Sequence, residues 1–204
     1  ILSDEVEPIR LEIVEKGSLE NIQPQAQARR SPARNEVEIR VHAAGLNFRD
    51  VLNALGVSTG DSSVLGIEFS GEVVAVGDCV HDYTVGDSVV AASAGSFASY
   101  LTVGVHLVAH KPNNLSHEEA AGIPTVFLTT VYCLERIARM KAGDRVLIHT
   151  ASGGVGQAAI QLAQRVGAEV YATASPGKWD TLRALGVEKV YNSRTTAFAE
   201  EILA

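Results

Sequence analysis

Cysteine and long apolar runs are both scarce in this sequence. Among 204 residues there are two cysteines, Cys79 and Cys133, and neither has the spacing of a metal ligand. We therefore predict neither a disulfide framework nor a zinc site, and we expect a reducing, cytoplasmic location. No apolar run approaches the roughly 18 residues that a membrane-spanning helix needs, and no basic-then-apolar leader opens the chain, so we expect no membrane association.

Basic residues are also few. The chain has 17 Lys and Arg against 24 Asp and Glu, which gives a formal net charge of -7. A nucleic-acid partner would need a basic face to neutralise its phosphates, so none is expected. With 46% hydrophobic residues, the composition is that of a folded protein with room for one large core or two small ones.

The first part of the chain has the periodicity of β-strands. Apolar residues alternate with polar ones at 9–13 and again at 37–41. Two further apolar runs, at 71–76 and 85–91, are bounded by glycines that suit tight turns. Residues 23–32, rich in Gln, Ala, Arg and Pro, are predicted to be a surface loop. This pattern predicts a small barrel-like domain over residues 1–122.

Over residues 123–204 strands and helices alternate instead. A capping-box pattern at 116–119 precedes a helix predicted over about 124–140. Strands are then predicted at 146–148, 170–174 and 189–191, with helices over 155–166 and about 178–185. Strand, helix and strand within about thirty residues are typical of a right-handed parallel unit. The fold class is therefore α/β, and the second domain is predicted to be built on a parallel sheet.

The connection between the first parallel strand and its helix has the residues of a dinucleotide-binding turn. It consists of Ala151, Ser152, Gly153, Gly154, Val155 and Gly156. Glycines let the backbone approach a pyrophosphate, and the helix N-terminus offers unpaired N–H groups and a positive dipole end. Ala151 replaces the first glycine of G-x-G-x-x-G, so the motif alone is a weak signal. An ordinary tight turn is the alternative.

The end of the second strand favours NADPH over NADH. At this position, about twenty residues after the turn, NAD-binding proteins carry a carboxylate for the ribose 2′-hydroxyl. Here Ser175 and Lys178 stand instead, and they can bind and neutralise a 2′-phosphate. Arg194 is assigned to the same cofactor-binding set. A solvated lysine is the alternative for Lys178.

Several blocks of the sequence resemble the medium-chain dehydrogenase/reductase superfamily, and within it the enoyl reductase domains of modular polyketide synthases and animal-type fatty-acid synthases. The blocks are Ala44–Leu52, Leu65–Gly71, Val85–Asp87, Phe127–Thr130, Ile148–Gly156 and Ala172–Asp180. The resemblance implies a GroES-like, β-barrel-type substrate domain over 1–122 and an NADPH-binding Rossmann-type domain over 123–204. The chain starts at Ile1 and stops at Ala204 inside a predicted helix, so we expect it to be truncated at its C-terminal end.

The resemblance also bears on metal binding. Zinc-dependent members carry a cysteine near Leu46 or Asn47 and a histidine in a Gly-His-Glu block, where this chain has Gly66-Ile67-Glu68. The structural zinc lobe has no counterpart either, because residues 91–97 contain no cysteine. A zinc alcohol dehydrogenase is therefore not expected, since no Lewis acid would stabilise an alkoxide. The six histidines are assigned solvated or core roles.

For the reaction, the resemblance implies hydride transfer from NADPH to the β-carbon of an α,β-unsaturated acyl thioester, followed by protonation at the α-carbon. It implies that Asn47 lies by the nicotinamide, Thr129 by the cofactor, and residues 152–156 under the pyrophosphate. Val51 falls where polyketide members carry a valine or a tyrosine linked to α-methyl stereochemistry, and a plain core valine is the alternative. The lysine and aspartate proposed as proton donors in the family would lie beyond Ala204.

The implied partners are an acyl carrier protein that presents a phosphopantetheine-linked enoyl thioester and the neighbouring synthase domains. A monomer and a homodimer are both compatible with the sequence.

Three other functions stay open. The same hydride step could close a cyclopropane on a γ-halo enoyl thioester, as in some cyanobacterial assembly lines. The chain could be a stand-alone zinc-free quinone reductase, or an inactive scaffold that keeps the fold.

Overall fold

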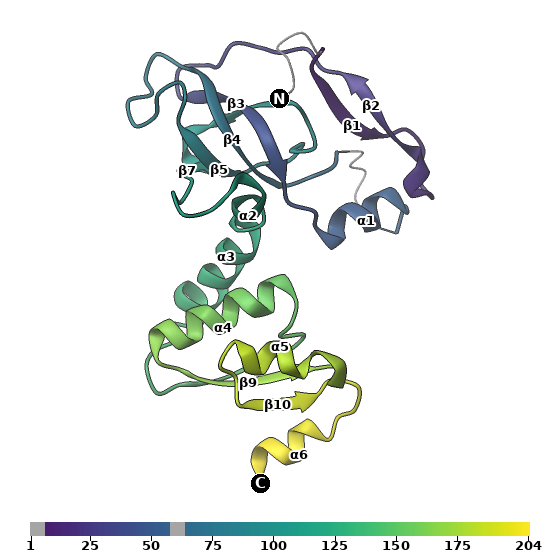
Figure 1. The fold of residues 1–204 in the computed structure, drawn as a ribbon, viewed down its shortest axis with the longest axis vertical. Coiled ribbons are helices and arrows are strands. Elements are labelled where there is room, and N and C mark those ends of the chain that lie inside the picture. Colours follow the sequence, from purple (N-terminus) through teal and green to yellow (C-terminus); the bar gives the residue numbers. More distant parts are fainter. Residues whose placement is uncertain (1–6, 58–63) are drawn as a thin grey trace. The chain divides into compact units, whose positions relative to one another are not determined.

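The computed structural model describes residues 7–57 and 64–204, which belong to two compact units (Figure 1). Unit 1 extends to Thr125, and unit 2 comprises Val126–Ala204. The division expected from the sequence lies at 122/123. An α/β fold class with an antiparallel first part and a parallel second part is confirmed.

Within the described part of unit 1, five strands form an antiparallel sheet. Its order is β6 (Tyr100–Gly104), β3 (Glu36–Ala44), β4 (Glu68–Val76), β5 (Ser88–Ala92) and β7 (Val108–His110). The side chains that alternate on β3, β4 and β5 bury Val37, Ile39, Phe69, Val73 and Val89 in one apolar cluster. The predicted strand at 85–91 starts later, at Ser88, because 85–87 form a turn.

A second, two-stranded sheet pairs β1 (Ile9–Ile13) with β2 (Ile22–Ala26). The prediction of a loop over 23–32 is therefore wrong for its first residues. In β2 the apolar Ile22, Pro24 and Ala26 alternate with two glutamines, but the central proline argues against a strand and four of the five residues are exposed. The strand conformation therefore depends on pairing with β1.

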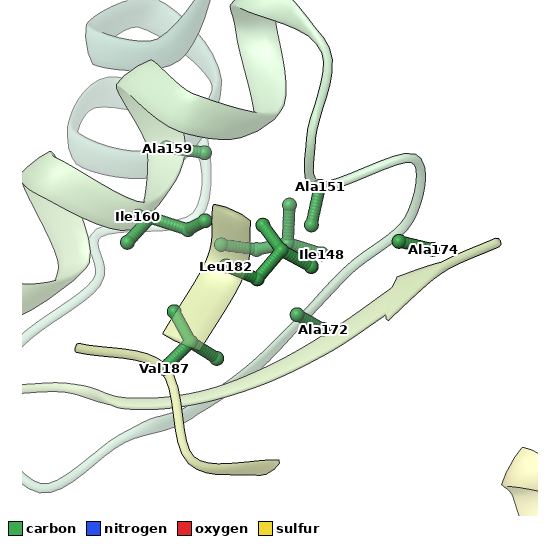
Figure 2. Close-up of a cluster of buried hydrophobic side chains, with 8 residues drawn as sticks. All are labelled: Ile148, Ala151, Ala159, Ile160, Ala172, Ala174, Leu182 and Val187. Atoms are coloured by element: carbon green, nitrogen blue, oxygen red, sulfur yellow. The ribbon is translucent and has the colours of Figure 1, made fainter. Parts of the chain in front are cut away.

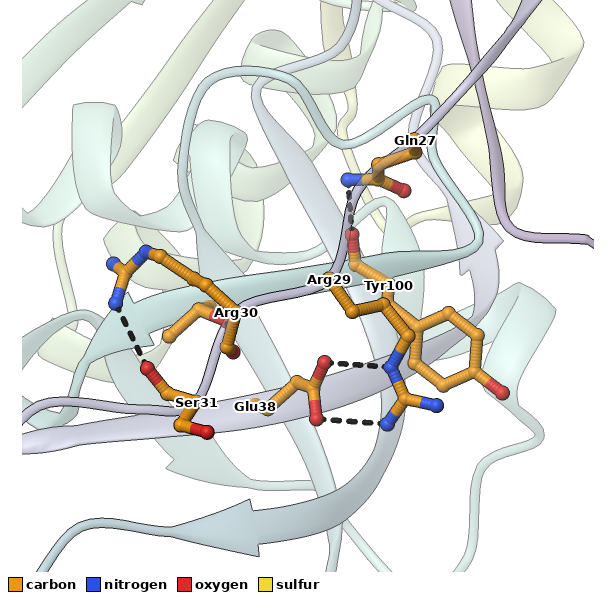
Figure 3. A network of polar contacts seen from close by, with 7 residues as sticks. Gln27, Arg29, Arg30, Ser31, Glu38 and Tyr100 are labelled. Atoms are coloured by element: carbon orange, nitrogen blue, oxygen red, sulfur yellow. Dashed lines mark hydrogen bonds and ion pairs between the residues drawn. The ribbon is translucent and has the colours of Figure 1, made fainter.

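The rest of that segment is fixed by polar contacts to the large sheet, as Figure 3 shows. Arg29 donates two hydrogen bonds of 2.8 Å to the carboxylate of the buried Glu38 on β3. The Arg29 guanidinium also lies 4.0 Å from the ring centre of Tyr100 on β6. Gln27 donates through Nε2 to the carbonyl of Tyr100 at 2.8 Å. The charge of Glu38 is thus paired where it is buried, as a buried carboxylate requires.

The helical segments of unit 1 are short. They are η1 (Leu19–Asn21), α1 (Phe48–Ala54), η2 (Val105–Leu107) and α2 (His117–Ala121). The capping box predicted at 116–119 is confirmed at the start of α2. Ser116 Oγ accepts from Glu119 N at 3.2 Å, and Glu119 Oε2 accepts from Ser116 N at 2.9 Å.

The helix predicted over 124–140 consists of α3 (Pro124–Thr130) followed by η3 (Val131–Ile137), which has π-helical hydrogen bonding. The backbone N–H of Ala138 bonds to the carbonyl of Cys133, five residues earlier, at 2.9 Å. The helix ends before Met140, and Arg139 takes a left-handed conformation with φ 53°. The predicted end at 140 was therefore too late, because Arg139 leaves the right-handed helical conformation. The change from four-residue to five-residue hydrogen bonding was not predicted either, because apolar periodicity does not reveal it.

Unit 2 contains three parallel strands in the order β10-β9-β8, and all of its residues are described. These strands are β8 (Arg145–Ile148), β9 (Glu169–Ala174) and β10 (Lys189–Asn192). Besides η3 and most of α3, its helical segments are α4 (Gly154–Val166), η4 (Pro176–Lys178), α5 (Trp179–Ala184) and α6 (Phe198–Leu203). Figure 2 shows the core, in which Ile160 of α4 and Leu182 of α5 pack with Ile148 and Ala172 of the strands.

Within residues 7–57 and 64–204, no helix has both the length and the apolar character needed to cross a bilayer.

Helix α2 is attached to the large sheet through His117. Its Nδ1 lies 2.8 Å from Oγ of the buried Ser70 on β4, and Ser70 Oγ itself donates to the Val89 carbonyl at 2.9 Å. Ser70 therefore accepts from His117, which places the ring proton on Nδ1. The His117 ring also stacks on His42 of β3, with 4.5 Å between ring centres. Sequence spacing gave no sign that these two histidines meet.

We expect acid to destabilise unit 1 through His117. Burial, with His42 and Lys111 nearby, lowers the pKa of His117 below its usual 6.5, and Glu118 and Glu72 oppose this shift. The folded state favours the neutral ring of His117. The resulting contribution to the free energy of unfolding is fully present above the pKa of this histidine in the unfolded chain, and it is lost as the pH falls through its lower pKa in the folded state.

Thermal midpoints measured from about pH 7 to about pH 5 should therefore fall more steeply for the wild type than for His117→Gln. His81→Gln, at an exposed histidine of the same unit, should keep the wild-type pH dependence. Equal pH dependence in His117→Gln and the wild type would contradict this role.

Candidate functional site

The turn between β8 and α4 lies at the carboxyl end of the parallel sheet and is held by hydrogen bonds from both sides. Ala151 N donates to the Thr173 carbonyl on β9 at 3.0 Å, and Gly153 N donates to the Thr150 carbonyl at 2.9 Å. Gln157 of α4 donates through Nε2 to the Ser152 carbonyl at 3.0 Å. Thr150 is held at φ 51°, a rare conformation for a β-branched residue that is often found at functional sites.

Gly156 allows α4 to start directly against this turn. A Cβ at this position would lie 2.6 Å from both the Cα and the carbonyl oxygen of Ala151, so a larger residue would push helix and turn apart. Ala151 is fully buried, and its methyl group belongs to the apolar core in Figure 2. Ala151, which departs from the glycine of the motif, therefore fills the core. Gly156 provides the close approach of helix α4 to the turn that the motif requires.

The N-terminus of α4 is open to an anion. This helix has 13 residues, its N-cap is Gly153, and none of the described side chains caps it. Its first turn contains no acidic residue. Gly154 and Val155 are exposed, and Ser152 and Gly153 are partly exposed. The N–H groups and the dipole of the first turn are thus directed at a place that a pyrophosphate can reach.

The other predicted cofactor-binding residues follow the next two strands. Ser175 comes directly after β9 and is the N-cap of η4, which ends at the exposed Lys178. Arg194 follows β10 and is exposed, and its backbone N–H is fixed by Asn192 Oδ1 at 2.9 Å. Because neighbouring parallel strands end at the same edge, the structure brings these three residues to the edge that carries the turn.

Trp179 is a residue near this edge to which the sequence alone gave no role. Its indole Nε1 donates to the Ala174 carbonyl at the end of β9 at 3.1 Å. The Arg183 guanidinium lies over its ring at 5.7 Å. Trp179 thus ties the start of α5 to the strand end and fixes the path of the Ser175–Lys178 segment.

Thr129 belongs to unit 2, on α3 two residues before the π-helical segment η3, and its side chain is exposed. The next residue, Thr130, is buried and donates through Oγ1 to the Val126 carbonyl at 2.7 Å. Thr129 is therefore the threonine of this pair that remains available to a ligand.

The predicted catalytic residues lie in unit 1, at α1. Asn47 immediately precedes this helix, and its backbone N–H donates to Asp50 Oδ2 at 2.9 Å. Its side-chain Nδ2 donates to Glu68 Oε1 of β4 at 2.8 Å. Val51 lies on α1 and is half-buried, next in sequence to the buried Asp50.

Two buried carboxylates support Asn47, and sequence reasoning assigned neither of them a role. Asp50 and Glu68 are each 2% exposed. Asp50 Oδ1 accepts from Gly66 N at 2.9 Å, and Glu68 Oε2 accepts from Thr125 N at 2.8 Å. The available signal was an acidic residue between apolar neighbours in a strand, Ile67-Glu68-Phe69, because such a residue must be paired when it is buried.

Among the residues that the structure describes, no group of three or more His, Cys, Asp or Glu side chains could hold a metal ion.

Comparisons with known proteins give one consistent family. The family description "Alcohol dehydrogenase GroES-like domain" matches residues 33–113. Polyketide synthase GfsB of Streptomyces halstedii is 45% identical over 199 residues, which cover 96% of this chain and 4% of that protein. The chain thus spans only a small part of the curated relatives it matches.

Two solved structures are similar over nearly the whole chain. The CurK enoyl reductase is 45% identical with a TM-score of 0.93, and the match covers 97% of this chain and 63% of that one. The Escherichia coli quinone oxidoreductase complexed with NADPH is 31% identical with a TM-score of 0.81, over 91% of this chain and 59% of that one.

We expect Gly156→Ala to destabilise unit 2. Helix propensity alone predicts a gain of about 1 kcal/mol, because alanine is the better helix former. The contact with Ala151 should outweigh this gain and lower the free energy of unfolding by about 1–3 kcal/mol, measured by chemical denaturation. Gly177→Ala, where a Cβ would meet open space, is the matched control and should change it by less than about 0.5 kcal/mol. A stabilised Gly156→Ala would contradict the close contact.

Proposed function

The chain belongs to the medium-chain dehydrogenase/reductase superfamily, where it is similar to the enoyl reductase domains of polyketide synthases, and from this premise we propose that it is an NADPH-dependent enoyl-thioester reductase. In this proposal residues 1–122 serve the substrate and residues 123–204 bind the cofactor. The acyl group is carried by an acyl carrier protein as a phosphopantetheine thioester, and other synthase domains are the neighbours.

The observation that carries the proposal is the edge of the sheet in unit 2. The uncapped start of α4, with Gly156 against Ala151, supports a pyrophosphate over residues 152–156. Ser175, Lys178 and Arg194 supply a hydroxyl and two cations at the ends of the neighbouring strands. A 2′-phosphate needs such groups, whereas the ribose 2′-hydroxyl of NADH would be bound by a carboxylate.

NADPH, when bound, supplies the hydride for the β-carbon of the enoyl thioester. The residues of the chain hold the reactants and exclude water. Thr129 and residues 152–156 bind the cofactor, and Asn47 orients its nicotinamide end. Val51 has no proton to give, so it shapes the acyl pocket and leaves protonation of the α-carbon to another group.

The first test is oxidation of NADPH by a simple enoyl thioester. The purified protein with crotonyl thioester and NADPH should show a loss of the NADPH absorbance and a product two hydrogens heavier by mass spectrometry. A free quinone in place of the thioester should give little turnover. No absorbance loss with the thioester would contradict ene reduction, and turnover of the quinone alone would favour a quinone reductase.

The same assay addresses ring closure. With a γ-chloro enoyl thioester, simple reduction leaves chlorine in the product, whereas cyclopropane formation removes it. We expect chlorine to be retained.

Lys178→Ala should lower the affinity for NADPH by at least about tenfold and leave the affinity for NADH little changed, because the charge-assisted bond to the 2′-phosphate is lost. Isothermal titration measures both affinities. Lys141→Ala is the control, since this exposed lysine precedes β8 at the other end of the strand. Absence of NADPH binding in the wild type would favour the scaffold alternative, and equal losses for NADPH and NADH would contradict the assignment of Lys178.

A further inference from the structure

The buried carboxylate of Glu68 has one hydrogen-bond donor on each oxygen. Asn47 Nδ2 donates to Oε1, and the backbone N–H of Thr125 donates to Oε2, both at 2.8 Å. Both partners are N–H groups, so both oxygens act as acceptors, as in an ionised carboxylate. Glu68 is 2% exposed and lies on β4, the central strand of the large sheet. The carboxylate is thus fixed in position.

This arrangement determines which end of the Asn47 amide faces Glu68. If the amide were turned over, Asn47 Oδ1 would lie against a carboxylate oxygen, and two acceptors would repel each other at that distance. The second N–H of Asn47 points toward the carbonyl of Gly45, with 3.5 Å between nitrogen and oxygen. Oδ1 is therefore the remaining polar atom of the Asn47 side chain, and it is an acceptor. It faces the start of α1, where Asn47 and Asp50 form a capping box, but an amide oxygen has two lone pairs, so one is left for a ligand.

Two neighbours keep this pair in place. A Cβ on Gly45 would lie 2.6 Å from Cγ and Oε1 of Glu68, so the glycine makes room for the carboxylate beside Asn47. Asp50 fixes the Asn47 backbone through Oδ2 and the Gly66 backbone through Oδ1, each at 2.9 Å. Backbone and side chain of Asn47 are thus each held by a buried carboxylate.

We propose that Glu68 is a positioning residue that presents Asn47 Oδ1 as a hydrogen-bond acceptor to an N–H donor on the ligand. Under the proposed function, on which this inference rests, the donor is the carboxamide N–H of the nicotinamide. Asn47 then orients the cofactor ring and does not donate a hydrogen bond to the enolate oxygen of the acyl substrate.

Three variants separate an acceptor from a donor at position 47. In Glu68→Gln, the oxygen of the introduced amide can still accept from Thr125, but the nitrogen of that amide faces Asn47. Asn47 must then turn over and present Nδ2 to the ligand. In Asn47→Asp, two carboxylates face each other. In the double variant Asn47→Asp/Glu68→Gln, the amide on residue 68 donates to the carboxylate on residue 47. The other carboxylate oxygen of residue 47 is again an acceptor for the ligand, and the total charge equals that of the wild type. Glu72→Gln, at a half-exposed glutamate of the same strand, is the control.

Isothermal titration with NADPH and with adenosine 2′,5′-bisphosphate, a fragment that lacks the nicotinamide, provides the readout. Glu68→Gln should weaken NADPH binding by at least about tenfold, the double variant should recover most of it, and Glu72→Gln should not change it. The fragment should bind all of these proteins equally. Wild-type NADPH affinity in Glu68→Gln, or no recovery in the double variant, would overturn the proposal. If Asn47→Asp does not fold, the other variants still decide the outcome.

A second measurement does not depend on the proposed function. In the ligand-free protein, the Asn47 side-chain amide should give a downfield, slowly exchanging proton resonance in the NMR spectrum that shifts in Glu68→Gln and is unchanged in Glu72→Gln. If the fragment fails to bind the wild type, the proposed function fails, while this resonance still tests the orientation. An Asn47 amide resonance that is the same in Glu68→Gln and the wild type would overturn the orientation.

Discussion

The close packing of α4 on the backbone of Ala151 is the constraint on which unit 2 depends. Because Gly156 has no side chain, the helix can start where the strand ends, and the Ala151 methyl group joins the core beneath. The helix N-terminus then points at the carboxyl edge of the sheet, where the ends of β9 and β10 also lie. If a methyl group separated the helix from the turn, the N–H groups in the first turn of α4 would move away from that edge. A close-packed interior has no empty volume in which the added methyl group could be placed without such a shift.

In unit 1 the comparable constraint is electrostatic. Asp50 and Glu68 are buried, and backbone or amide N–H groups satisfy their oxygens. A buried carboxylate in this state fixes every donor around it, because each lost hydrogen bond would leave an uncompensated charge. The loop before α1, the turn at Gly66 and the backbone at Thr125 are thereby held in one arrangement. Rigid placement of this kind suits a site that must orient a ligand to within a fraction of an ångström.

The parts of the fold that follow from periodicity were predictable, and the parts that follow from pairing were not. The β8–α4–β9 unit has apolar residues at strand and helix spacing, with a glycine turn between them, and its elements were predicted correctly. β2 escaped prediction because its residues pair with β1 without burying an apolar face. The predicted end of the helix after 124 was too late because Arg139 takes a left-handed conformation, and the π-helical bonding of η3 was not predicted because it has no sequence period of its own. The glycine turn, Ser175 and Lys178 were predicted from the motif and its position after the strands, and Asn47 and Thr129 from the resemblance. Glu68 was missed because its role depends on two partners far from it in sequence.

The contact of Trp179 with the end of β9 has a practical consequence. The chain contains a single tryptophan, so its tryptophan fluorescence comes from one indole at a known place. That indole is bonded to the Ala174 carbonyl and is the direct sequence neighbour of Lys178. An event that moves the Ser175–Lys178 segment must change the environment of the indole, and reduced nicotinamide absorbs where tryptophan emits. Occupancy of this edge can therefore be followed optically in the unlabelled protein, without attaching a dye that would itself disturb so tightly packed a turn.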